Sequence, residues 1–98
     1  MSRYRLTNLA EADLARIWLY IAEDRPTAAD RQIAKLREAF RFLAKNPNVG
    51  EPRPKLGPRM RVFSVKGYVI YFHTVNDGIE IVRVVHGARE IRDLNSLD

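Results

Sequence analysis

The sequence predicts an α+β fold in which an N-terminal helical hairpin packs on one face of a small, mainly antiparallel sheet. Three observations support this fold. The first half of the chain contains two segments with helical apolar spacing, the second half contains three strand-like segments joined by short turns, and a short strand candidate precedes the first helix. The expected order is β-α-α-β-β-β. With 98 residues, the whole chain (1–98) is expected to form a single domain.

The N-terminal strand is expected at residues 3–6. Thr7 and Asn8 offer a cap for the first helix, which is expected to run to about Glu23. Trp18 belongs to the apolar stripe of this helix and is therefore expected in the core. The stripe comprises Leu14, Ile17, Trp18 and Ile21.

The second helix has the clearest periodicity in the chain. Thr27 offers a cap, with Asp30 at the third helical position, and Pro47 ends the helix because proline disfavours helical geometry in the residue before it. Apolar residues recur at alternating steps of four and three residues, which places them on one face. They are Ala29, Ile33, Leu36, Phe40 and Leu43.

The C-terminal half is expected to be a three-stranded antiparallel meander. Residues 48–58 form a connector rich in proline and glycine. The strands are expected at residues 61–65, 68–75 and 79–86, with turns at residues 66–67 and 76–78. The last two strands are almost continuously apolar, so they are expected to be central and covered on both faces.

Composition excludes several classes of function. The chain has no cysteine, which rules out disulfides, thiol nucleophiles and cysteine metal sites. It shows no phosphate-cradling glycine loop and no cluster of metal ligands, so neither a cofactor nor a metal is expected. No apolar run approaches the roughly 20 residues of a membrane span, and no signal peptide is evident. A cytoplasmic protein without membrane association is expected.

The net charge of +5 is localised, which predicts an anionic partner. Residues 53–66 carry five basic side chains and no acidic one, whereas both expected helices are of mixed charge. The alternative is that these charges only protect a sheet edge from aggregation. A partner-binding role is favoured because no acid is interleaved. The basic residues are Arg53, Lys55, Arg59, Arg61 and Lys66.

The end of the last strand offers further candidates. Arg83 lies among valines, where it either extends its guanidinium to water or binds a carboxylate or phosphate from a rigid strand. Arg89 follows the strand after a glycine and is either a surface arginine or an anion contact. His86 is favoured as a structural residue, because no acid or serine at a suitable spacing nominates a catalytic triad.

The first helix offers a possible interface. Leu19 and Tyr20 fall outside its apolar stripe, so they are expected to be exposed. Single exposed apolar residues are common, but two adjacent ones make a candidate partner-binding patch.

The order and spacing of several motifs resemble the ParE/RelE superfamily of bacterial type II toxin–antitoxin modules, and ParE in particular. The resemblance covers nearly the whole chain. The matching segments are Tyr4-Arg5-Leu6, residues 10–14, Ile17-Trp18-Leu19-Tyr20, residues 43–50, Arg61-Val62-Phe63, residues 68–72 and residues 82–91.

This resemblance implies a non-enzymatic toxin, important for plasmid stabilisation, that inhibits DNA gyrase and has no catalytic residues. It also implies a ParD-like antitoxin that forms a hetero-oligomer with the toxin and binds operator DNA, so that the toxin meets the operator only indirectly. An acidic antitoxin tail that folds on binding would suit a basic, partly apolar surface. The expected antitoxin- or target-binding residues are Leu19, Tyr20, Arg53, Lys55, Arg59, Arg61, Arg83, His86 and Arg89.

The alternative within the superfamily is cleavage of messenger RNA on the ribosome, as in RelE. RelE-type nucleases use several basic residues and a tyrosine near the C-terminus. Arg89 matches one of these positions and Arg61 lies near another, but Val69 stands where RelE has an arginine. No tyrosine follows Arg89. The catalytic set is therefore incomplete, although His86 and Tyr71 remain possible substitutes.

Overall fold

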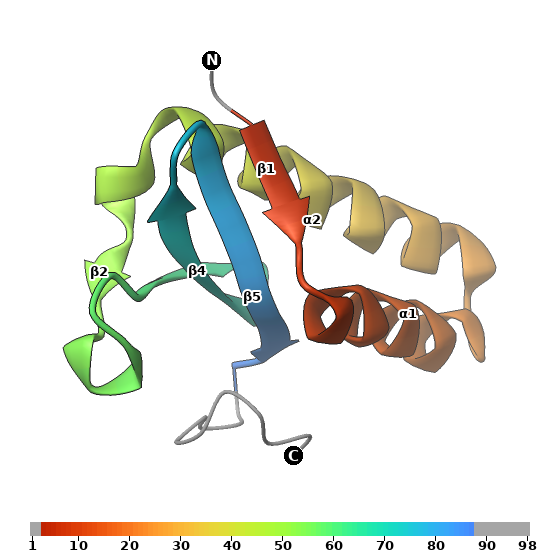
Figure 1. The fold of residues 1–98 in the computed structure, drawn as a ribbon. Coiled ribbons are helices and arrows are strands. Elements are labelled where there is room, and N and C mark those ends of the chain that lie inside the picture. Colours follow the sequence, from red (N-terminus) through yellow and green to blue (C-terminus); the bar gives the residue numbers. More distant parts are fainter. Residues whose placement is uncertain (1–2, 88–98) are drawn as a thin grey trace.

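A computed structural model describes residues 3–87 and confirms the predicted α+β class. Two helices pack side by side on one face of a five-stranded mixed sheet, as Figure 1 shows. The strand order is β1-β5-β4-β3-β2, with β1 parallel to β5 and every other neighbouring pair antiparallel. The two long strands, β4 and β5, are central, as predicted.

The helical hairpin follows the first strand directly. Strand β1 (Arg3–Leu6) leads into α1 (Asn8–Ala22), and Thr7 caps the helix because its hydroxyl accepts a hydrogen bond from the Ala10 N–H at 3.0 Å. Helix α2 (Pro26–Lys45) begins one residue before the cap predicted at Thr27. Proline suits a first helical position, because its missing N–H would have no helical partner there.

The connector is more ordered than the sequence suggested. It contains two short 3₁₀ turns, η1 (Pro47–Val49) and η2 (Pro54–Leu56), and between them strand β2 (Glu51–Pro52). Strand β2 pairs with the start of β3 and forms one edge of the sheet. Sequence patterns did not reveal it, because two residues cannot show an alternation and one of them is a proline.

The meander contains the three predicted strands. They are β3 (Arg61–Val65), β4 (Tyr68–Val75) and β5 (Gly78–His86). Lys66 and Gly67 both have positive φ, at 50° and 85°, as a two-residue hairpin turn requires. Gly78, expected in the next turn, is instead the first residue of β5, where it pairs with Arg3.

The main core lies between the sheet and the hairpin. Its centre is formed by Ile70 and Phe72 of β4 with Leu36, Phe40 and Leu43 of α2, all fully buried. Most residues of the two predicted apolar helix stripes face this core. Trp18 does not: its side chain is 36% exposed, and its indole N–H donates to Asp30 at 2.8 Å. The prediction of a core tryptophan was therefore wrong.

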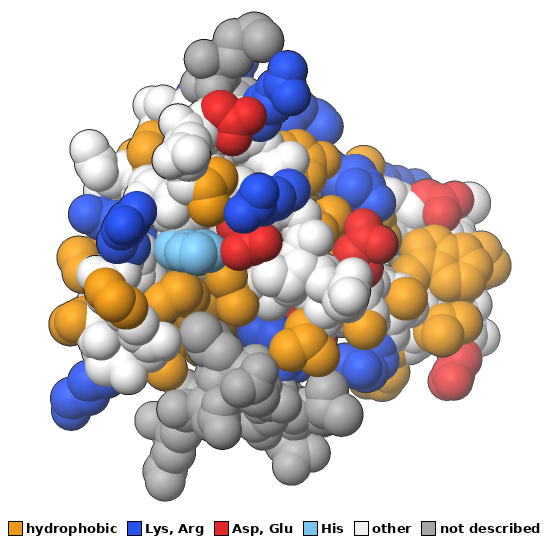
Figure 2. Space-filling view, in the orientation of Figure 1, with side chains coloured by type: hydrophobic (Ala, Val, Ile, Leu, Met, Phe, Trp, Pro, Cys, Tyr) orange, Lys and Arg blue, Asp and Glu red, His pale blue; other side chains and the backbone are white. Residues whose placement is uncertain are grey.

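The opposite face of the sheet carries a second apolar cluster. Met60, Val62, Tyr71 and Val85 are buried there, and three half-buried apolar residues pack around them. Figure 2 shows hydrophobic side chains on this face below a row of charged groups. Both faces of β4 and β5 are therefore apolar in part, which explains their continuous apolar sequence.

We expect Gly78→Ala to destabilise the fold, because β1 lies too close for a side chain. A Cβ at this position would clash with the Arg3 carbonyl oxygen, so β1 would have to move off β5. The expected loss is at least about 2 kcal/mol of unfolding free energy, measured by urea denaturation. Gly67→Ala is the control, since no atom lies within 4 Å of its Cβ and only backbone strain is added. An equal loss in both variants would contradict this account.

Candidate functional site

A buried ion pair joins α1 to β5. The Arg83 Nε donates to the Asp13 Oδ2 at 2.7 Å, and an Arg83 terminal nitrogen donates to Oδ1 at 2.9 Å. Arg83 is fully buried and Asp13 is 2% exposed. The hydrogen bonds to the carboxylate raise the pKa of Arg83 above its usual value, although burial opposes this effect. Two parallel bonds of this kind fix both orientation and distance.

The Asp13 carboxylate also completes the edge of the sheet. It accepts a hydrogen bond from the Val84 backbone N–H at 2.9 Å and another from Arg16 at 3.2 Å. Strand β1 ends at Leu6, so beyond Ile81 β5 has no strand on that side, although β4 continues on the other. The Thr7 hydroxyl donates to the Val82 carbonyl at 2.8 Å, and the two side chains thereby satisfy backbone groups that β1 leaves unpaired.

Arg83 is consequently not a recognition group on the surface, and its prediction as a binding residue was wrong. Of the two alternatives raised by the sequence, the arginine does bind a carboxylate, but the carboxylate belongs to this chain. A β-bulge between Tyr71 and Phe72 shifts the register here, so that Arg83 lies opposite Tyr71. Sequence patterns did not identify Asp13 as the partner, because it stands among ordinary helix-surface acids.

His86 lies exposed at the end of β5 and packs against an aromatic ring. Its imidazole meets the Tyr68 ring edge-on, with the ring centroids 5.6 Å apart. Burial, and then the nearby Tyr20 hydroxyl, raise the pKa of Tyr68. This contact supports the structural role favoured for His86, while its predicted part in binding stays a prediction. Arg89 lies outside the described residues.

The basic segment separates into bonded and unbonded side chains. Arg53 pairs with Glu51 at 2.6 Å, and Arg61 donates to the Gly50 carbonyl at the same distance. Lys55 is exposed on η2. Arg59 is exposed in the turn before β3 and makes no hydrogen bond or ion pair with any residue in the described part of the chain. Of the predicted arginines, Arg59 is thus the best placed to meet a ligand.

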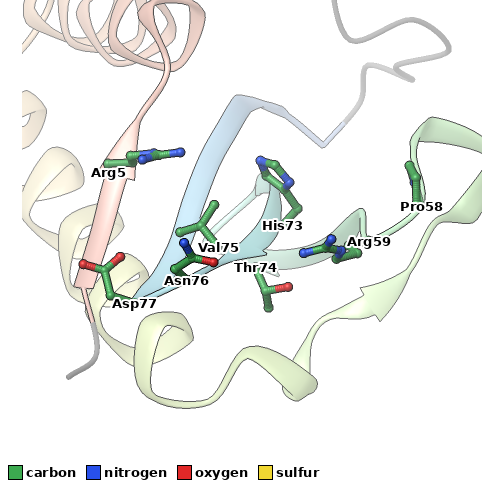
Figure 3. A pocket seen from close by; sticks show the side chains of 8 residues that line it. All are labelled: Arg5, Pro58, Arg59, His73, Thr74, Val75, Asn76 and Asp77. Atoms are coloured by element: carbon green, nitrogen blue, oxygen red, sulfur yellow. The ribbon is translucent and has the colours of Figure 1, made fainter.

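Arg59 lies between two hollows in the surface. The larger, of 780 Å³, reaches Arg5 on β1 and His73 on β4, and Figure 3 shows these three side chains around it. The smaller, of 260 Å³, is lined by Arg61 and the prolines of the connector. Sequence reasoning missed Arg5 and His73 as site residues, because they are far apart in the chain and only the sheet brings them together.

The Glu80 carboxylate holds two of the side chains that line the larger hollow. Glu80 of β5 accepts hydrogen bonds from His73 at 2.8 Å and from Arg5 at 3.1 Å. The bond from His73 lowers the pKa of Glu80, and the charge of Arg5 adds to this effect although burial opposes it. The three residues face away from the helices, in one row across β1, β5 and β4. These bonds fix the His73 imidazole and the Arg5 guanidinium beside the hollow.

The exposed apolar patch on α1 is the second candidate surface. Leu19 is 61% exposed and Tyr20 is 78% exposed, as their place off the stripe predicted. Trp18, held by Asp30, adds to this patch. Figure 2 shows hydrophobic side chains over the part of the hairpin where α1 ends. Three adjacent exposed apolar residues on one helix are typical of an interaction surface.

The described residues offer no group of three or more histidine, aspartate or glutamate side chains that could hold a metal ion. Within residues 3–87, neither helix is long and apolar enough to cross a bilayer. The candidate functional surfaces are therefore the α1 patch and the two hollows around Arg59.

Comparison with known proteins matches nearly the whole chain. The family model described as the ParE toxin of type II toxin–antitoxin system, parDE, matches residues 4–91. Toxin ParE1 of Caulobacter vibrioides is 34% identical over 95 residues, which cover 94% of this chain and 96% of the relative. Toxin RelE2 of the same organism is 35% identical over 80 residues, or 82% of this chain and 89% of the relative.

A solved structure has the same fold. It is described as the chromosomal ParDE TA system from P. aeruginosa, and it superimposes with a TM-score of 0.72 at 25% sequence identity. The match covers 88% of this chain and 96% of that chain.

We expect Asp13→Asn to lower the unfolding free energy by about 3 to 5 kcal/mol, because it leaves the buried Arg83 without its carboxylate. Urea denaturation of the variant measures the loss. Glu11→Gln, which removes an exposed carboxylate from the same helix, is the matched control and should change little. The double variant Asp13→Leu/Arg83→Met should recover part of the loss, since no buried charge remains although the Val84 N–H loses its acceptor. Similar losses in the single and double variants would show that the charge is not the cause.

Proposed function

The chain belongs to the ParE toxin family of type II toxin–antitoxin systems, and on this basis we propose that it poisons DNA gyrase and is neutralised by a ParD-like antitoxin. In this proposal the toxin acts by binding. It stabilises cleaved gyrase–DNA complexes and performs no chemistry of its own. The antitoxin forms a hetero-oligomer with the toxin in the cytoplasm, and the relative described as a ParDE system supports a partner of this kind.

The observation that favours binding over catalysis is the incomplete set of nuclease-like side chains. Arg61 lies nearest to a basic position of the RelE-type nucleases, and one nitrogen of its guanidinium donates to the carbonyl of the buried Gly50 at 2.6 Å. Val69 occupies another position of that set and offers neither a charge nor a proton. Cleavage by a ribose hydroxyl needs proton transfer and stabilisation of charge on the phosphate. Arg61 can still contact a phosphate, but Val69 supplies neither charge nor proton transfer, so the set needed for cleavage is incomplete.

The second candidate function, ribosome-dependent cleavage of messenger RNA, has one specific observation in its favour. A relative named Toxin RelE2 is about as similar to this chain as Toxin ParE1 is. The two functions differ in substrate and in product, so they can be separated directly.

We expect the purified toxin to block supercoiling of relaxed plasmid by DNA gyrase and to accumulate cleaved DNA covalently bound to the enzyme. Agarose electrophoresis after proteinase treatment measures both effects. A reaction without toxin serves as the negative control. Normal supercoiling without trapped cleavage would refute the gyrase proposal. Cuts in messenger RNA on translating ribosomes, mapped by primer extension, would instead support the nuclease.

The antitoxin is proposed to cover the α1 patch. An amphipathic helix that binds in a groove or on a helix surface uses a few apolar anchors, and large exposed apolar side chains supply most of the energy at such interfaces. Leu19 and Tyr20 project from a rigid helix and contribute little to the core. Contacts of Arg53, Lys55 and His86 with the antitoxin or the target are part of the same proposal.

We expect Tyr20→Ala or Leu19→Ala to weaken antitoxin binding at least tenfold, or about 1.4 kcal/mol, without loss of fold stability. Isothermal titration calorimetry with the ParD-like antitoxin measures the affinity, and thermal denaturation checks the fold. Val49→Ala is the matched control, because Val49 is 51% exposed and lies on η1, away from α1. Wild-type affinity in both α1 variants would place the antitoxin elsewhere.

A further inference from the structure

The smaller hollow beside Arg59 has the composition of an anion site. Its polar lining consists of Asn48, Arg59, Arg61 and Thr74, and its walls are three prolines and Met60. No carboxylate lines it. Two guanidinium groups at one hollow repel each other, and an anion between them would convert this repulsion into attraction. The apolar walls strengthen the effect because they exclude water from one side.

The two arginines are prepared differently for a ligand. Arg61 is fixed, because one terminal nitrogen donates to the Gly50 carbonyl and so orients the remaining N–H groups. Arg59 is exposed and has no hydrogen-bond or ion-pair partner within residues 3–87. A fixed arginine beside an unbonded one gives a site that is preorganised on one side and adaptable on the other.

The larger hollow continues the site across the sheet. It shares Pro58, Arg59 and Thr74 with the smaller one and extends to His73 and Arg5 (Figure 3). Neighbouring strands lie about 4.8 Å apart, so the backbones of Arg5 and His73, with β5 between them, are separated by roughly 10 Å. Their side chains meet at the Glu80 carboxylate. The negative charges of Asp77 at the rim and of Glu80 offset part of the positive charge of this groove. The net positive charge is therefore concentrated around Arg59 and Arg61.

We propose that the two hollows form a groove that binds the phosphodiester backbone of a DNA duplex. The lining donors are arginine, histidine, threonine and asparagine, which are among the side chains that commonly contact phosphate oxygens. An acidic peptide is less suitable for the larger hollow, because only Pro58 and Val75 are available there for apolar anchors. Single-stranded nucleic acid is disfavoured because no phenylalanine, tyrosine or tryptophan lines either hollow for base stacking.

The inference goes beyond gyrase inhibition, since it concerns DNA bound by the toxin alone. The contact involves only the backbone and reads no sequence, so operator recognition remains with the antitoxin. Two to three neutralised phosphates should give a salt dependence of log K against log[salt] with a slope of about −2 to −3. The affinity should therefore fall about tenfold or more between roughly 50 and 200 mM salt.

Fluorescence anisotropy of a short labelled DNA duplex, titrated with the toxin at several salt concentrations, tests the proposal. Arg59→Gln should weaken binding several-fold and reduce the magnitude of the slope by about 1. Arg59→Lys should retain most of the slope, because the charge is kept. Arg31→Gln, which removes the same charge from the exposed surface of α2, is the matched control and should leave the slope unchanged.

Three results would overturn the proposal. One is the absence of duplex binding at low salt. Another is an equal effect of Arg59→Gln and Arg31→Gln, which would mean that only the overall charge matters. The third is tighter binding of an oligoglutamate peptide than of the duplex at equal salt, which would assign the groove to an acidic peptide. None of these results depends on gyrase, so they leave the proposed function to its own test.

Discussion

The carboxylate of Asp13 is the point on which the two layers of this fold depend. It satisfies the buried charge of Arg83 and the backbone N–H of Val84 at the same time. A strand normally supplies the second of these bonds, but β1 has already ended. A helix side chain therefore replaces a strand, and α1 is fixed in its position over β5. Burying the pair has a desolvation cost, so its value lies in defining one geometry more than in stability alone.

The sequence predicted the fold class and most elements, because helical and strand periodicities are strong in this chain. It failed where a contact between distant residues decided the outcome. Simple alternation along β5 places Arg83 on the same face as Ile79 and Ile81. The bulge interrupts this alternation, so that Val84 joins the core beneath the helices and Val85 joins the opposite cluster. A bulge leaves no clear mark in an apolar segment that is buried on both faces.

The candidate site was predictable where local sequence patterns define it. Basic charge without interleaved acid identified residues 53–66, and positions off the helix stripe identified Leu19 and Tyr20. The sequence could not show that Gly50 engages Arg61 while Arg59 makes no bond to the described residues 3–87. Nor could it show that Arg5 and His73, far apart in the chain, share one carboxylate. Such groupings depend on strand order, and the parallel pairing of β1 with β5 is the least local feature of the sheet.

The position of β5 has a consequence for how the chain acquires its activity. This strand lies between β1 and β4 in the sheet, yet it follows both of them in the sequence. Until β5 is synthesised, β1 has no neighbour and α1 has no partner for its buried acid. Translation proceeds at about 5–20 residues per second and favours early folding of N-terminal segments. The strand order prevents such early folding here, so the nascent chain becomes a folded toxin only after β5 has been synthesised.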